Sequence, residues 1–132
     1  MEPATQEVVT QLQRFFARRC TEVVAAWLFG SVARGTARAD SDVDVAVLFT
    51  ARQLSTLEGG VLDLEGELER DLGRVVDVVD VRRAPVDLVH RVLRDGIPLC
   101  DRDASKRIRF EVKARNDYFD LLPHLHRYRR HG

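Results

Sequence analysis

The stretch that most constrains this chain is residues 28–49, LFGSVARGTARADSDVDVAVLF. Two apolar runs flank a polar turn, and the second run opens with two aspartates one residue apart, Asp42 and Asp44. Both runs are short and rich in the branched and aromatic residues that are typical of buried strands. The stretch therefore predicts two strands, 23–29 and 43–49, joined by the turn.

The other elements are predicted by similar patterns. Apolar residues at helical spacing predict helices over 5–19, 54–72, 85–96 and 103–122, and a β-branched run predicts a third strand over 74–81. The segment IPLC fits a short edge strand, where proline is tolerated. The expected fold class is α/β (α+β), with a small mixed sheet of three to four strands and helices packed mainly on one face.

Length and composition favour a single domain. We expect residues 1–122 to form it and residues 123–132 to be a flexible basic tail. No run approaches the ~18 apolar residues of a membrane span, and the N-terminus lacks a signal-peptide pattern. Two cysteines provide neither a disulfide framework nor a four-cysteine zinc site. A cytoplasmic protein without membrane contact is expected.

Charge is balanced overall but not along the chain. Lys plus Arg and Asp plus Glu number 21 each, so we expect no direct nucleic-acid binding. Residues 1–100 carry 12 basic and 16 acidic side chains, whereas residues 101–132 carry nine basic and five acidic ones. The basic end fits partner docking or phosphate attraction, and it fits a solvated helix end equally well.

Asp42 and Asp44 open the second strand. Alternate residues of a strand share a face, so the two carboxylates should lie about 6.6 Å apart along it. Adjacent carboxylates repel unless a cation lies between them, and their oxygens suit Mg²⁺, with Mn²⁺ as an alternative. Two acids on a solvated strand edge are the simpler explanation of the same pattern.

A two-metal site needs a third carboxylate from another strand. The third strand offers Asp77 and Asp80, which point to opposite faces because they are three residues apart. Asp77 is flanked by valines, where an unpaired carboxylate is costly, whereas Asp80 ends the strand and can be satisfied by water or a turn. We predict Asp77 as the ligand, or as the base that accepts a proton from an attacking hydroxyl.

The turn adds candidate phosphate contacts. Gly30 lets the backbone approach a ligand closely, and the N–H groups and hydroxyl at Ser31 can bind phosphate, although a Gly-Ser turn alone is weak evidence. Arg34 and Arg38 are either contacts to a triphosphate or surface arginines on a loop.

The combined pattern, "LFGSVARGTARADSDVDVAVLF" followed by "RVVDVVDV", resembles the minimal nucleotidyltransferase (MNT) group of the polymerase-β-like nucleotidyltransferase superfamily. The remainder, ending in "RIRFEVKARNDYFDLL", resembles the MntA-type antitoxins of HEPN–MNT toxin–antitoxin pairs. The resemblance implies that Gly30 and Ser31 hold nucleotide phosphates and that Asp42, Asp44 and Asp77 form a two-metal site.

The activity that the resemblance implies is a protein adenylyltransferase. It would transfer AMP from ATP, with Mg²⁺, to a tyrosine hydroxyl of a HEPN ribonuclease toxin with which it forms a hetero-oligomer. Two alternatives stay open: an antitoxin that inhibits its toxin by binding alone, and a nucleotidyltransferase that acts on a small hydroxyl compound. In the last helix, Phe119 is expected in the core, and Tyr118 can shape a nucleotide pocket, a toxin surface or the core.

Overall fold

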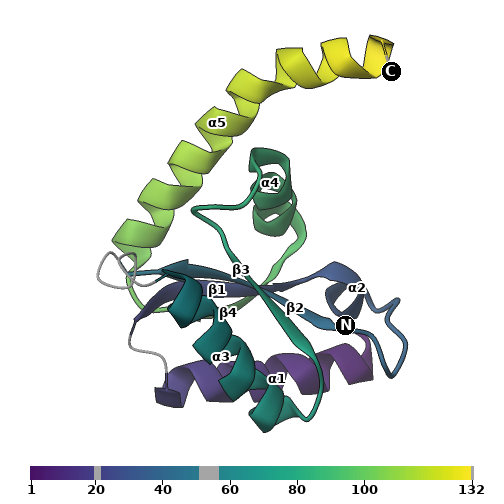
Figure 1. Ribbon diagram of the computed structural model, residues 1–132, viewed down its shortest axis with the longest axis vertical. Helices are drawn as coiled ribbons and strands as arrows, with labels where there is room; N and C mark the ends of the chain where they lie inside the picture. The colour runs from purple at the N-terminus through teal and green to yellow at the C-terminus, as the bar shows by residue number, and fades with distance from the viewer. Residues whose placement is uncertain (20–21, 51–56, 132) are drawn as a thin grey trace.

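The computed structural model describes residues 1–19, 22–50 and 57–131. Its elements follow in the order α1 (Pro3–Arg19), β1 (Val23–Phe29), α2 (Gly30–Arg34), β2 (Val43–Phe49), α3 (Leu57–Leu72), β3 (Val76–Asp80), α4 (Val86–Asp95), β4 (Ile97–Asp101) and α5 (Ala104–His131) (Figure 1). The strands β1 and β2 have the predicted bounds. The first residues of the predicted helix over 54–72 lie outside the described residues.

The four strands form one mixed sheet in the order β3-β2-β1-β4. β1 pairs antiparallel with β2 and with β4, whereas β2 and β3 run parallel. The segment that contains Pro98 is an edge strand, as expected. The mixed sheet with its helices confirms the predicted fold class.

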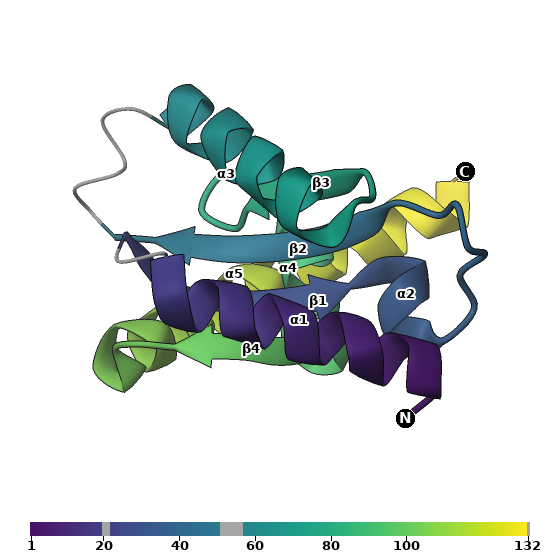
Figure 2. The ribbon, with the colours of Figure 1, turned by 90° about the horizontal axis from the view of Figure 1, so that it is seen from below.

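One face of the sheet is covered by α1 and α3, which lie side by side across it in Figure 2. The amphipathic face of α1 buries Leu12, Phe15 and Phe16 completely. These side chains pack with Leu28 of β1 and Val45 of β2 into the larger of two apolar clusters. This layer holds α2 as well, because the Thr5 hydroxyl of α1 donates to the Val32 carbonyl at 2.6 Å.

The opposite face is covered by α4 and α5 (Figure 1). There Trp27 and Leu48 of the sheet pack with Val89 and Val92 of α4 and Ala114 of α5. Helices therefore cover both faces rather than mainly one. The physical reason is that β1 and β2 are apolar at nearly every position, so both of their faces need cover from water.

The last helix differs from its predicted length. α5 continues through Pro123 to His131, although the sequence predicts an end at residue 122. An interior proline removes one backbone hydrogen bond without forbidding helix on either side. In Figure 1 this helix bends in its last part and extends beyond the body. Within the described ranges, every helix is too short or too polar to cross a membrane.

Candidate functional site

The candidate site lies at the edge of the sheet where β1 ends and β2 begins. Phe29, the last residue of β1, is the register partner of Asp44. On the other side of β2, Asp44 is the register partner of Asp77 in the parallel strand β3. Adjacent strands lie about 4.8 Å apart, so the fold brings two carboxylates that are far apart in sequence to neighbouring positions.

Both carboxylates point away from the α1–α3 layer. Val43 and Val45, on either side of Asp44, are completely buried in that layer. Since side chains alternate along a strand, Asp44 and Asp77 project from the face that α4 and α5 cover. Asp42 immediately precedes the strand and is exposed.

Gly30 lies directly against Asp44. Its φ of +79° is a left-handed conformation, and a β-carbon added there would lie 2.2 Å from Oδ2 of Asp44. Only glycine combines that backbone conformation with so close an approach. Gly30 begins the short helix α2, which carries Ser31 and ends at Arg34. The predicted phosphate contacts thus adjoin the carboxylates in the structure.

The charges at this edge influence one another. Burial raises the pKa of the Asp44 carboxyl, and the negative charges of Asp77 and then Asp42 raise it further. The exposed Arg34 guanidinium has the opposite effect and lowers the pKa of Asp44. Electrostatic coupling of this kind needs proximity, so two other predicted acidic residues and one predicted basic residue lie near Asp44.

The expectation that valines bury Asp77 is wrong, whereas the turn expected to satisfy Asp80 is present. Asp77 is exposed, whereas Asp80 is only 7% exposed and its Oδ1 accepts a hydrogen bond from the Arg82 N–H at 3.0 Å. The valines next to Asp77 do not bury it, because its face of β3 lies at the open edge of the sheet. Its place beside Asp44 follows from register rather than from burial.

Sequence reasoning missed Arg74. Its Nη2 donates to the Ser41 carbonyl at 2.8 Å, and Ser41 in turn accepts the Arg38 N–H on its hydroxyl at 2.9 Å. These bonds hold the tight turn that delivers Asp42 to the start of β2. The sequence carries no signal for this contact, because 33 residues separate Arg74 and Ser41.

The donor set suits a hard divalent cation. Three carboxylates face one region, and a bound cation would offset the repulsion that raises the pKa of Asp44. As the side chains stand, no group of three or more acidic, His or Cys residues in the described ranges is arranged to hold a metal ion. Asp42 and Asp77 are exposed, so rotation of their side chains can bring oxygens together.

Comparison with known proteins also identifies similarity to nucleotidyltransferases. A family profile described as "Polymerase beta, Nucleotidyltransferase" matches residues 10–105. A structure described as a minimal nucleotidyltransferase is 36% identical, with a TM-score of 0.54, over 70% of this chain and 90% of that one. A search of curated proteins finds no match.

Two further solved structures are toxin–antitoxin complexes. One, a toxin–antitoxin crystal structure with AMP-PNP, has a TM-score of 0.69 and 28% identity over 86% of this chain and 88% of that one. The other contains a tri-AMPylated Shewanella oneidensis HEPN toxin in complex with an MNT antitoxin, and it has a TM-score of 0.65 and 26% identity over 89% and 88%.

Proposed function

Because the chain belongs to the polymerase beta nucleotidyltransferase family, we propose that it is an antitoxin that transfers AMP from ATP to a tyrosine hydroxyl of a HEPN ribonuclease toxin. The observation that carries the proposal is the pairing of Asp44 with Asp77 beside Gly30. The similar structures with AMP-PNP and with an AMPylated HEPN toxin support both the nucleotide and the class of partner.

Asp42, Asp44 and Asp77 would hold Mg²⁺, in a two-metal site, with Mn²⁺ as a substitute. When bound there, the cations would neutralise phosphate charge and lower the pKa of the attacking hydroxyl. The three carboxylates would be the protein ligands of these cations. Partial burial of Asp44 suits this role, because neighbouring groups restrict the orientation of a half-buried ligand more than that of a solvated one.

The turn residues would bind and orient the nucleotide. Backbone N–H groups of Gly30 and Ser31 would donate to phosphate oxygens, because the first N–H groups of a helix have no partner within it. Arg34 is exposed and near Asp44, so its guanidinium can contact the same phosphates. Fixing the triphosphate in this way presents the α-phosphorus to the incoming oxygen.

The proposed transfer needs no reactant besides ATP and the tyrosine. The tyrosine oxygen forms a bond to the α-phosphorus, the bond from that phosphorus to the bridging oxygen breaks, and pyrophosphate leaves. The exposed Asp77 carboxylate can accept the tyrosine proton. The attached AMP adds bulk and negative charge, which would keep RNA from the toxin's site. We place both proteins in the cytoplasm as a hetero-oligomer.

The test separates transfer from binding. The chain and the HEPN toxin proposed as its partner are co-expressed, with the wild type compared with Asp42→Ala/Asp44→Ala, and growth and complex formation are both measured. We expect the double variant to form the complex but not to rescue growth. Rescue by that variant would support inhibition by contact and contradict the proposed transfer.

A further inference from the structure

A groove runs between α4 and α5 on the face from which the carboxylates project. Figure 1 shows the two helices on the same side of the sheet, with α5 extending beyond α4. The groove has a volume of about 330 Å³, which is within the range of small-molecule sites. Its walls are formed by His90, Leu93, Arg94, Glu111, Ala114, Arg115 and Phe119.

The groove lies at the same edge of the sheet as the candidate site. α4 ends at Asp95, and β4 begins two residues later with Ile97, the register partner of Leu28. Leu28 is two residues before Gly30, so the last turn of α4 adjoins the start of α2. The carboxylates of Asp44 and Asp77 project from this face as well.

Charges link the two regions. Arg34 acts on Asp44 on one side and on Asp95 on the other. Asp95 is itself held by Arg94, whose Nε and Nη2 donate to its carboxylate at 3.0 and 2.7 Å. The Arg34 charge is therefore felt both by the carboxylates of the site and by the Arg94–Asp95 pair at the groove, so its guanidinium is a candidate contact for phosphate.

Two of the residues that line the groove, His90 and Phe119, carry flat aromatic rings. The His90 ring of α4 stacks on the Tyr118 ring of α5, with centroids 3.6 Å apart and planes 2° apart. Phe119 is 59% exposed, so the expectation that it belongs to the core is wrong. A phenyl ring left open to water beside basic side chains is a surface that a planar anionic ligand would cover.

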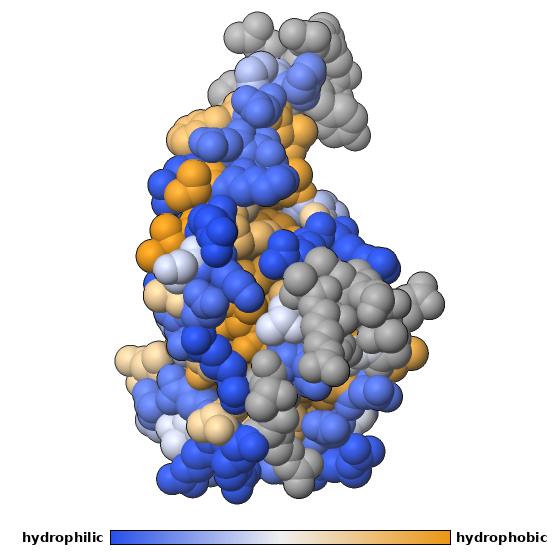
Figure 3. Space-filling view, turned by 90° about the vertical axis from the view of Figure 1, so that its left-hand side faces the viewer, coloured by the Kyte–Doolittle hydropathy of each residue, from blue (hydrophilic) through white to orange (hydrophobic). Residues whose placement is uncertain are grey.

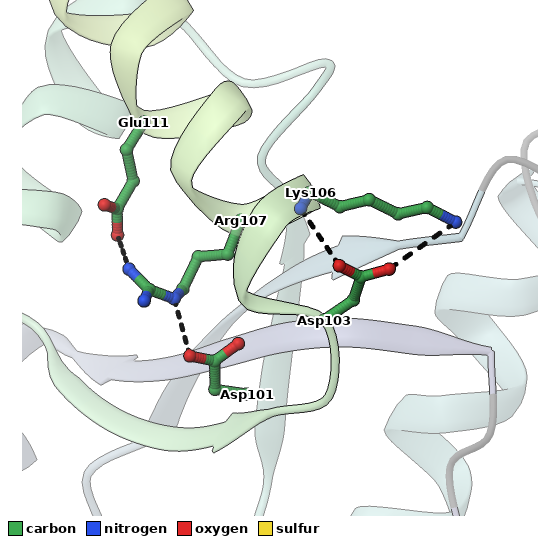
Figure 4. Close-up of polar contacts among 5 residues, drawn as sticks. All are labelled: Asp101, Asp103, Lys106, Arg107 and Glu111. Carbon is green, nitrogen blue, oxygen red and sulfur yellow. Dashed lines mark hydrogen bonds and ion pairs between the residues drawn. The ribbon is translucent and has the colours of Figure 1, made fainter.

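The groove is held in shape from its far end. In Figure 4, Arg107 of α5 donates to Asp101 of β4 at 2.8 Å and to Glu111 at 3.0 Å. Asp103 caps the helix by accepting the Lys106 N–H at 3.1 Å. These contacts fix the base of α5 against the sheet and pair the one acidic wall residue, Glu111. Arg94 is paired with Asp95, so Arg115 gives the groove its basic charge.

We propose that this groove binds the nucleobase of the nucleotide co-substrate, with Phe119 and the His90–Tyr118 pair as stacking surfaces; the proposal rests on the proposed function. The phosphates then reach across Arg34 to Gly30 and Ser31. Stacking on aromatic rings tolerates any base and favours the larger purines. A partner side chain is the competing occupant, because apolar residues are exposed along α5 in Figure 3.

The test compares ATP with inorganic tripolyphosphate, which lacks a base. Equilibrium binding of each is measured with Mg²⁺ for the wild type, Phe119→Ala and Val112→Ala. Val112 is 46% exposed on the same helix but does not line the groove, so it is the matched control. We expect Phe119→Ala to weaken ATP binding about tenfold and to leave tripolyphosphate binding unchanged, and Val112→Ala to change neither.

The proposal would be overturned if Phe119→Ala bound ATP as tightly as the wild type, or if it lost affinity equally for ATP and tripolyphosphate. If Phe119→Ala weakened toxin binding but not ATP binding, the groove would be assigned to the partner. Label transfer to the toxin by the wild type, measured alongside, separates this inference from the proposed function. If the wild type labels the toxin and Phe119→Ala keeps its ATP affinity, only the groove proposal is refuted. If Phe119→Ala loses affinity for ATP but not for tripolyphosphate and the wild type does not label the toxin, only the proposed antitoxin activity is refuted.

Discussion

The left-handed backbone of Gly30 lies against the carboxylate of Asp44, so that a β-carbon on the glycine would be 2.2 Å from Oδ2. The end of β1 and the start of β2 thus meet at a point that leaves no room for a side chain at residue 30. This contact ties the predicted phosphate-binding turn to the predicted carboxylates, and it gives the first prediction a matched control.

Gly30→Ala should abolish nucleotide transfer. The added β-carbon must displace Asp44, and the left-handed conformation costs about 1–2 kcal/mol for a residue with a side chain. Gly73→Ala imposes a similar strain at φ +69°, but nothing lies within 4 Å of its β-carbon. Urea unfolding followed by the fluorescence of Trp27, together with label transfer, measures both effects.

Both variants should lose stability, with the larger loss in Gly30→Ala because its β-carbon also meets Asp44. Only Gly30→Ala should lose transfer. If the two variants transfer AMP equally well, the contact between Gly30 and Asp44 has no role in the site.

Asp44→Asn should stabilise the chain at neutral pH when divalent cations are absent. The pKa of Asp44 is raised in the folded state, chiefly by burial and then by Asp77 and Asp42, so its ionised form is disfavoured by folding. Stability from this group is full below the unfolded pKa of an aspartate, about 3.9, and it is lost as the pH rises through the folded pKa. The advantage of the asparagine should shrink as the pH falls toward that value.

Urea unfolding at several pH values in the presence of a chelator measures this difference, with the exposed Asp63→Asn as control. Added Mg²⁺ should stabilise the wild type more than Asp44→Asn, because the cation binds the folded carboxylates. A difference in unfolding free energy that does not vary with pH would contradict the assignment.

Arg74→Ala should weaken both the fold and the site. Its guanidinium donates to the Ser41 carbonyl at 2.8 Å from a partly buried position, and loss of such a bond costs about 2 kcal/mol. Since the turn delivers Asp42, the variant should also need more Mg²⁺ for half-maximal transfer.

Arg18→Ala is the control for Arg74, because its 3.9 Å pair with Asp71 is on the surface and should contribute little. A normal Mg²⁺ requirement in Arg74→Ala would mean that Arg74 stabilises the fold without positioning Asp42.

The strands and the identity of the clustered residues were predictable because both depend on local pattern. The apolar runs of β1 and β2 are short and bounded by Gly30 and Asp42, so their limits follow from the sequence. Alternation along the third strand predicted that only one of Asp77 and Asp80 can join the site, and the parallel register places Asp77 beside Asp44.

The missed features depend on contacts between distant elements. The exposure of Asp77 is set by the open edge of the sheet, which the valines around it do not reveal. Phe119 belongs to a series of apolar residues at the spacing of a buried helix face. It is exposed because α5 extends past the sheet that would cover this residue. The placing of α4 and α5 on the second face was implied by the continuous apolar runs of the central strands but was not predicted.

The most direct test measures transfer of label from ATP, radiolabelled in its α-phosphate, to the purified HEPN partner with Mg²⁺. Wild type is compared with Asp77→Asn, and with Asp80→Asn on the same strand as the matched charge-removal control. We predict label on the partner with the wild type and with Asp80→Asn, and none with Asp77→Asn. Equal labelling by both variants would contradict the three-carboxylate site, and no labelling by the wild type would contradict the proposed transfer.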